Sequence, residues 1–120
     1  MKILVVDDSA AMRMIVIRTL RKAGFKDHAF IEAADGALAL ESIQANAPDL
    51  VMSDWNMPNM TGIELLRKLR ADANPIQFGF VTSEYTDEMR ALAKEAGAMF
   101  LIAKPFNEDS FRDALDPILA

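Results

Sequence analysis

Short apolar runs alternate along this chain with longer segments of helical period, and this alternation constrains the fold more than any other feature. Apolar or β-branched runs predict five strands, at Lys2–Val6, Ala29–Glu32, Leu50–Ser53, Phe78–Val81 and Met99–Ile102. Several of these runs are almost continuously apolar, as is typical of strands covered on both faces. Strands that alternate with helices favour βαβ units around a parallel sheet. Right-handed crossovers and two-sided coverage then predict an α/β, doubly wound fold, whose ligands bind beyond the carboxyl ends of the strands.

Apolar residues three and four positions apart predict a helix after each strand. Asp35 is a candidate cap for the second helix, Thr61 and Glu64 form a capping box for the third, and Asn107 begins the fifth. The predicted apolar stripes are Met12, Ile15, Val16, Thr19 and Leu20; Leu38, Ala39 and Ile43; Leu65, Leu66 and Leu69; Met89, Leu92, Ala93 and Ala96; and Phe111, Leu115 and Ile118.

Length and composition indicate one globular domain over residues 1–120. The chain has 120 residues, 52% hydrophobic and 26% charged, which is ordinary for a folded protein of this size. Its net charge of −5 argues against nucleic-acid binding, which normally requires a basic face. The chain has no cysteine, so disulfides and thiolate metal sites are excluded. No apolar run approaches the roughly 18 residues of a membrane span, and we therefore expect a cytoplasmic protein without membrane contact.

Charged residues follow three of the predicted strands at the point where each strand ends. The doublet Asp7-Asp8 ends the first apolar run, Asp54 follows the third, and Lys104 follows the fifth. In a parallel sheet the carboxyl ends of the strands meet at one rim, so these side chains should lie close together. Three acids and one ammonium group at one rim suggest a metal-assisted site for phosphoryl chemistry.

The polar residues at the strand ends also match a known family in order and spacing. The chain resembles the receiver domains of two-component response regulators along its whole length, at Asp7-Asp8, Asp54, Thr82-Ser83 and Lys104-Pro105-Phe106. It looks particularly like the CheY-like, single-domain chemotaxis regulators at Val6–Ser9, Met12-Arg13 and Asp54–Met60. The resemblance implies a five-stranded sheet in the order 2-1-3-4-5 with five helices, and a cis peptide bond between Lys104 and Pro105.

The expected chemistry centres on Asp54, whose carboxylate would attack phosphorus and become an acyl phosphate. Mg²⁺ prefers oxygen ligands, and Asp8 and Asp54 would supply them directly, with Asp7 bound directly or through water. The family pattern adds the backbone carbonyl of Asn56. Without metal, the three crowded carboxylates should raise one another's pKa values.

Two further side chains would contact the phosphoryl group. The Lys104 ammonium would meet one phosphoryl oxygen, and the Thr82 hydroxyl would donate a hydrogen bond to another. Polar side chains at Asn56 and Glu84, where family variation influences hydrolysis, predict a short-lived acyl phosphate.

The resemblance also implies partners. A histidine kinase or a phosphotransfer protein would donate the phosphoryl group, and a downstream target would bind the face formed by the fourth helix, fifth strand and fifth helix of what we expect to be a monomer. Receivers usually carry an aromatic residue where this chain has Leu101. Coupling to the target face is therefore expected to run through Ser83, backbone shifts or the neighbouring Phe100.

Other interpretations remain open from the residues alone. An Mg²⁺-dependent phosphohydrolase with an aspartate nucleophile would use similar groups, but such enzymes generally have a second aspartate where Asn56 stands. A flavodoxin-like nucleotide or flavin module is disfavoured because no Gly-rich loop follows the first strand. Taken singly, an Asp doublet is more often a helix cap or a turn. The occurrence of Asp7-Asp8, Asp54, Thr82 and Lys104-Pro105 together at successive strand ends favours the site. Trp55 is expected to be partly exposed beside it.

Overall fold

A five-stranded parallel sheet forms the centre of the computed structural model, which describes residues 1–119. Its strands are β1 (Lys2–Val6), β2 (Ala29–Ala33), β3 (Leu50–Ser53), β4 (Gln77–Thr82) and β5 (Leu101–Ala103). The strand order is β2-β1-β3-β4-β5, and every neighbouring pair is parallel. The predicted fold class and strand order are therefore confirmed. Ala120, the last residue of the predicted domain, lies outside the described range.

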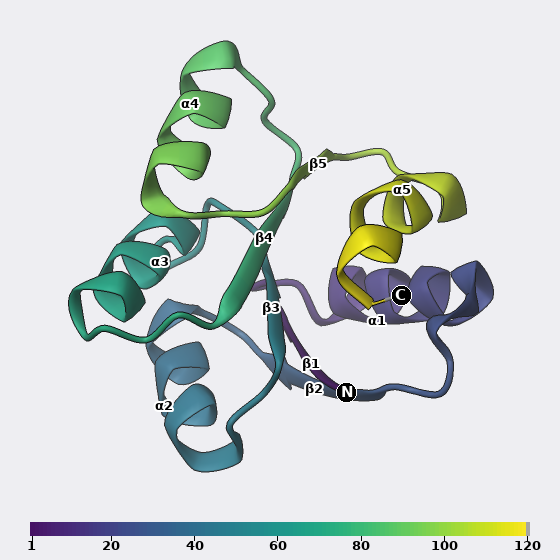
Figure 1. Ribbon diagram of the computed structural model, residues 1–120, viewed down its shortest axis with the longest axis horizontal. Coiled ribbons are helices and arrows are strands. Elements are labelled where there is room, and N and C mark those ends of the chain that lie inside the picture. The colour runs from purple at the N-terminus through teal and green to yellow at the C-terminus, as the bar shows by residue number, and fades with distance from the viewer. Residues whose placement is uncertain (120) are drawn as a thin grey trace.

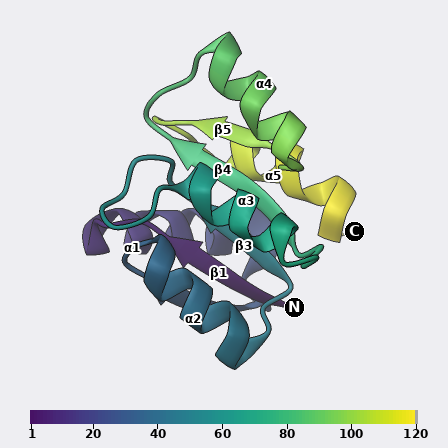
Figure 2. The same cartoon turned by 90° about the vertical axis from the view of Figure 1, so that its left-hand side faces the viewer.

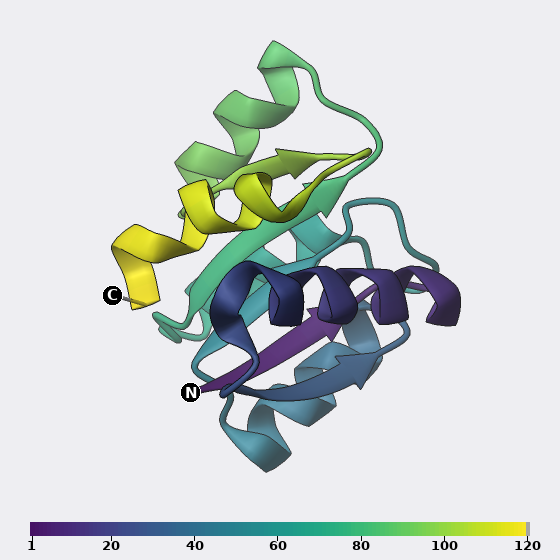
Figure 3. The ribbon, with the colours of Figure 1, turned by 90° about the vertical axis from the view of Figure 1, so that its right-hand side faces the viewer.

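Helices cover both faces of the sheet (Figure 1). They are α1 (Ala10–Leu20), which continues into a short π-helical segment η1 (Arg21–Phe25), α2 (Gly36–Asn46), α3 (Gly62–Ala71), α4 (Asp87–Ala96) and α5 (Glu108–Leu119). Figure 2 shows α2, α3 and α4 in front of one face, and Figure 3 shows α1 and α5 in front of the other. The predicted caps of α2 and α3 are present: Asp35 accepts the Leu38 N–H, and Thr61 with Glu64 forms the capping box. None of the described helices is long and apolar enough to cross a membrane.

The alternation of side chains along each strand gives the protein two hydrophobic cores. On β1, Leu4 and Val6 join the core under α2, α3 and α4, whereas Ile3 and Val5 join the core under α1 and α5. Ile3 and Leu4 are fully buried, and burying such a side chain contributes about 1.5–3 kcal/mol. Because both faces are covered, the carboxyl rim of the sheet is the place where its polar residues meet.

Several details of the predicted elements are wrong. β2 ends at Ala33 rather than Glu32, and β4 spans Gln77–Thr82 rather than Phe78–Val81. The fifth strand is predicted over Met99–Ile102 but occupies Leu101–Ala103, although Met99 N–H already bonds to the Phe78 carbonyl at 2.7 Å. The Phe100 ring lies against Gly79 on β4, where a methyl group would be only 2.1 Å from it. The regular strand therefore starts after this contact, at the pair Phe80 and Leu101.

The predicted apolar stripes also include residues that the helices leave in solvent. Ile15 on α1, Leu38 on α2 and Leu92 on α4 are 44%, 47% and 39% exposed. On α1 the next residue, Val16, faces the core instead, because successive residues point about 100° apart around a helix. The buried stripes of these helices are consequently narrower than the sequence pattern predicts.

Candidate functional site

Three acidic side chains gather at the carboxyl rim of the sheet. Asp7 and Asp8 follow β1, and Asp54 follows β3, the strand beside it. The Asp54 N–H bonds to the Val6 carbonyl at 2.8 Å, which aligns the ends of the two strands. One carboxylate oxygen from each acid lies within 4.8 Å of the others. Asp7 is buried, Asp54 is partly buried and Asp8 is exposed, so the cluster opens to solvent on one side.

Lys104 brings a positive charge to this cluster from β5. Its Nζ lies 3.0 Å from Asp7 Oδ2 and 3.5 Å from Asp54 Oδ2. The Lys104 N–H bonds to the Thr82 carbonyl at 2.8 Å, and the Lys104–Pro105 peptide bond is cis, as the resemblance implies. The side chain of Lys104 is only 14% exposed, so its ion pairs are less screened than surface pairs.

The environment of Asp54 disfavours its negative charge. Burial is the largest effect and raises the pKa of the Asp54 carboxyl, and the nearby charge of Asp7 raises it further. Lys104 and the hydrogen bond from Trp55 N–H to Asp54 Oδ1, at 2.7 Å, act in the opposite direction. The direction of the pKa shift agrees with the expectation from sequence. Its main cause is loss of solvent rather than repulsion between carboxylates.

The other predicted residues surround the acids at different depths. Thr82 ends β4 and is fully buried, and its hydroxyl accepts a hydrogen bond from the Glu84 N–H at 3.3 Å. Ser83 and Glu84 are exposed in the following turn. Asn56 and Pro105 are exposed, and Leu101 is partly buried on β5. Within residues 1–119, hydrogen bonds join Lys104 to the acids but do not join the side chains of Thr82 or Asn56 to them.

The loop after Asp54 is closed at its base. The Gly62 N–H bonds to the Trp55 carbonyl at 2.8 Å, and a methyl group at Gly62 would lie 2.2 Å from the Asp54 carbonyl oxygen. Only glycine fits there. Trp55 is 9% exposed and packs on Phe80 with ring centroids 4.7 Å apart. The prediction that Trp55 is partly exposed is therefore wrong, because its ring belongs to the core beneath α3.

Sequence reasoning missed contacts that support the site. Arg13 Nε pairs with Glu32 at 2.9 Å, and its Nη1 donates to the Asp7 carbonyl. Asp35, identified from sequence only as a helix cap, also accepts a hydrogen bond from Asn59 Nδ2 at 2.8 Å. The sequence signal that could have indicated a turn here is Pro58-Asn59. Asn tolerates the left-handed backbone, and Asn59 has a φ of 67°. Nothing in the sequence pattern shows that this turn meets Asp35.

The donor atoms of the cluster fit a hard divalent cation. Mg²⁺ selects carboxylate, carbonyl and water oxygens, and the acids supply carboxylate oxygens with no sulfur or imidazole among them. One ammonium group cannot balance three adjacent carboxylates, so a bound cation would relieve the remaining repulsion. Fold and site together define a doubly wound α/β protein with a cluster of acidic side chains at its carboxyl rim.

Comparison with known proteins places this arrangement in a family. Residues 3–116 match the family model described as the response regulator receiver domain. Chemotaxis protein CheY-3 of Vibrio cholerae is 41% identical over 120 residues, which cover 98% of this chain and 91% of that protein. Chemotaxis protein CheY1 of Helicobacter pylori is 38% identical over 122 residues, covering 99% and 97%. The structure of Vibrio cholerae CheY4 matches with a TM-score of 0.85 at 35% identity, covering 98% of both chains.

The chain therefore belongs to the response regulator receiver family and is closely related to the chemotaxis regulators within it. This relationship supports a phosphoacceptor signalling regulator. It does not support the phosphohydrolase that the sequence alone left open.

Proposed function

We propose that Asp54 accepts a phosphoryl group from the phosphohistidine of a histidine kinase or a phosphotransfer protein, and that the phosphorylated protein changes its binding partner. In this step an oxygen of the Asp54 carboxylate forms a bond to phosphorus while the P–N bond of the donor breaks. The electron pair of that bond returns to the imidazole. The observation that carries the proposal is the position of Asp54 between Asp7, Asp8 and the Lys104 ammonium. The reaction modifies the protein itself rather than an external substrate.

The residues of the site have separate roles in this reaction, and one set would bind the metal ion. Asp7, Asp8, Asp54 and the backbone carbonyl of Asn56 would hold Mg²⁺. When bound, Mg²⁺ supplies positive charge that offsets repulsion between the carboxylate and the phosphoryl oxygens. The Trp55 N–H holds Asp54 Oδ1, so the nucleophile is oriented before the donor arrives.

Two side chains receive the transferred group. The Lys104 ammonium stabilises one phosphoryl oxygen, and the Thr82 hydroxyl donates to another. Asn56 and Glu84, two residues beyond Asp54 and Thr82, carry exposed polar side chains, which supports a phosphoryl group that water removes quickly.

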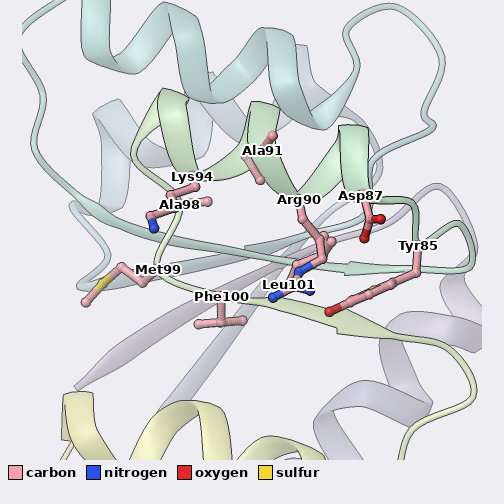
Figure 4. Close-up of a pocket in the computed structure, with 10 residues that line it drawn as sticks. Tyr85, Asp87, Arg90, Ala91, Lys94, Ala98, Met99, Phe100 and Leu101 are labelled. Atoms are coloured by element: carbon pink, nitrogen blue, oxygen red, sulfur yellow. The ribbon is translucent and has the colours of Figure 1, made fainter.

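The output of the switch is proposed to lie on the face of α4, β5 and α5. A groove of about 440 Å³ lies along α4 and β5, and Figure 4 shows its lining side chains. Tyr85 and Met99 are 46% and 50% exposed there, beside the cations Arg90 and Lys94. Asp87 adds one carboxylate to the lining, so the two cations leave a net positive charge, which suits a target segment that carries apolar and acidic residues.

The path from the phosphoryl group to this groove is short. Thr82 pairs with Ala103 across β4 and β5, and Phe80 pairs with Leu101, which lines the groove. Movement of Thr82 toward a phosphoryl oxygen would therefore be passed to Leu101 through the strand pairing. Ser83 and Pro105 continue the same two chain segments beyond the strands. We further propose that residues 1–120 act as one monomeric, cytoplasmic receiver domain.

Trp55 gives a direct test, because its buried ring follows Asp54 in the chain. Mg²⁺ and then beryllofluoride or a small phosphodonor would be titrated while Trp55 emission is followed, in the wild type and in Asp54→Asn. The wild type should respond first to the metal and again to the phosphodonor. Asp54→Asn keeps the shape of the side chain and should lose the second response. If Trp55 emission of the wild type changed with the metal but not with the phosphodonor, Asp54 would be ruled out as the phosphoacceptor.

A further inference from the structure

The loop that follows Asp54 is attached at its tip to the start of α2. Asn59 Nδ2 donates to Asp35 Oδ2 at 2.8 Å, and the Gly36 N–H donates to the Met60 carbonyl at 3.3 Å. The two segments are in direct contact, since a methyl group at Gly36 would lie 2.6 Å from the Met60 carbonyl oxygen. The loop is thus held by α2 at Asn59 and Met60, in addition to the bond between Gly62 and Trp55 at its base.

Asp35 is placed to do more than cap a helix. Its Oδ1 accepts the Leu38 N–H at 2.8 Å, which completes the first turn of α2. A cap requires no more than this one oxygen. The second oxygen is directed out of the helix to Asn59. Asp35 is only 7% exposed and Asn59 is exposed, so the bond is shielded from water on the Asp35 side only.

Asn59 is matched to this contact by its backbone. Its φ of 67° lies in the left-handed region, which few residues other than glycine, Asn and Asp adopt at low cost. A glycine would satisfy the backbone equally well. What Asn adds is the side-chain amide, and that amide is the group that meets Asp35.

Asn56 lies between the base of the loop at Trp55 and the contact with α2 at Asn59, and the next residue, Met57, has its side chain buried in the core. The backbone carbonyl of Asn56 is the proposed fourth protein ligand of Mg²⁺, and its own side chain makes no hydrogen bond among the described residues. The position of this carbonyl therefore depends on its neighbours in the loop. The same region of the chain supports a second ligand, since the Asp7 N–H bonds to the Ala33 carbonyl at the end of β2, two residues before Asp35.

We infer that Asp35 and Asn59 are positioning residues for the cation site, which they serve by fixing the loop so that the Asn56 carbonyl is presented to the metal. This inference rests on the proposed function, because it concerns the same Mg²⁺ site. Neither side chain contacts the metal or the phosphoryl group. Their effect is on the preorganisation of a ligand, and it should appear as a change in metal affinity.

Two substitutions remove the contact while preserving what each backbone needs. Asp35→Ser keeps a good helix cap but is too short to reach Asn59, and Asn59→Gly keeps the left-handed backbone but has no amide. The Mg²⁺ dissociation constant would be measured from Trp55 emission for each variant and for the double variant. Each single variant should bind Mg²⁺ roughly 10-fold more weakly, the usual effect of losing a group that orients a ligand. The double variant should be no weaker than the singles.

Two controls separate this effect from general destabilisation and from charge. Asp49 Oδ2 accepts the Lys2 N–H at 2.7 Å at the opposite rim of the sheet, so Asp49→Ser is matched in residue type and in the loss of an anchoring carboxylate. It should leave the Mg²⁺ dissociation constant unchanged. Asn59→Gly changes no charge, so its effect cannot come from long-range electrostatics.

The outcomes distinguish this inference from the proposed function. Unchanged Mg²⁺ affinity in Asp35→Ser and Asn59→Gly would overturn the inference while leaving the phosphoacceptor site intact. The inference would also be overturned if the losses of Mg²⁺ affinity in the two single variants added fully in the double variant. It would likewise be overturned if Asp49→Ser lost Mg²⁺ affinity to the same extent. A wild type with no Mg²⁺ response would instead reject the cation site itself.

Discussion

Asp54 combines two requirements that oppose each other. It must be accessible enough to react, yet it lies partly buried beside another carboxylate, where its charge is poorly solvated. Among residues 1–119, Lys104 is the only cationic side chain within ion-pair distance of the cluster. The metal-free site therefore lowers the stability of the fold, as is common where function sets the arrangement of charges.

Replacing Asp54 by Asn should stabilise the metal-free protein near neutral pH, because the amide removes a negative charge that burial disfavours in the folded state. The folded protein raises the pKa of this carboxyl, so the wild type loses stability as pH rises from the unfolded pKa to the folded pKa. The advantage of Asp54→Asn should be absent in acid below the ordinary Asp pKa and constant above the raised one. Urea unfolding across this range measures it, and an advantage that is equal at every pH would contradict the assigned cause.

At the scale of elements, the edge of the sheet formed by β4 and β5 contains one close contact between a ring and a glycine, in addition to the strand pairing. The Phe100 ring occupies the space above Gly79, and β5 is only three residues long beyond it. Gly79 weakens β4 as an isolated strand, because glycine has no side chain to pack and loses more backbone freedom on folding. The ring of Phe100 replaces the missing side chain, which keeps β4 buried where it approaches Thr82.

Gly79→Ala should destabilise the protein by roughly 1–3 kcal/mol, because the added methyl group overlaps the Phe100 ring. Removing the ring as well, in Gly79→Ala with Phe100→Ala, should make the glycine substitution much less harmful. A double-mutant cycle of unfolding free energies measures this coupling. Simple addition of the two losses would show that the ring does not set the packing at this edge.

The bounds of the elements show which features local sequence could predict. β1 and β3 have the predicted limits, because their apolar runs end abruptly at polar residues. β5 does not, because its start depends on the contact between Phe100 and Gly79, which belong to different strands. The buried ring of Trp55 and the bond between Asp35 and Asn59 are likewise contacts between distant segments. The convergence of Asp7, Asp8, Asp54 and Lys104 was predictable because parallel topology alone brings strand ends together.

At the scale of the whole molecule, the site links the strands of one sheet. The acids follow β1 and β3, and the lysine follows β5 at the edge of the sheet. These segments keep their relative positions only in the folded protein. Ligands that bind the folded state alone shift the folding equilibrium in its favour.

Mg²⁺ should therefore raise the unfolding free energy of the wild type, by about 1.4 kcal/mol for each tenfold increase once its concentration exceeds the dissociation constant. Asp54→Asn loses one carboxylate ligand, so its response should begin at higher Mg²⁺. Thermal unfolding at constant ionic strength measures both, with Na⁺ replacing Mg²⁺ as the control for screening. Equal stabilisation by the two salts would show that no specific cation site is present.

The order of the charged residues along the chain has a consequence for biosynthesis. The ribosome adds the last of the three acids about fifty residues before Lys104, so the acids leave it before their counter-charge does. During this interval, divalent cations in the cell can offset the negative charge of the three carboxylates. We therefore expect free Mg²⁺ to assist the folding step in which β5 and Lys104 join the sheet.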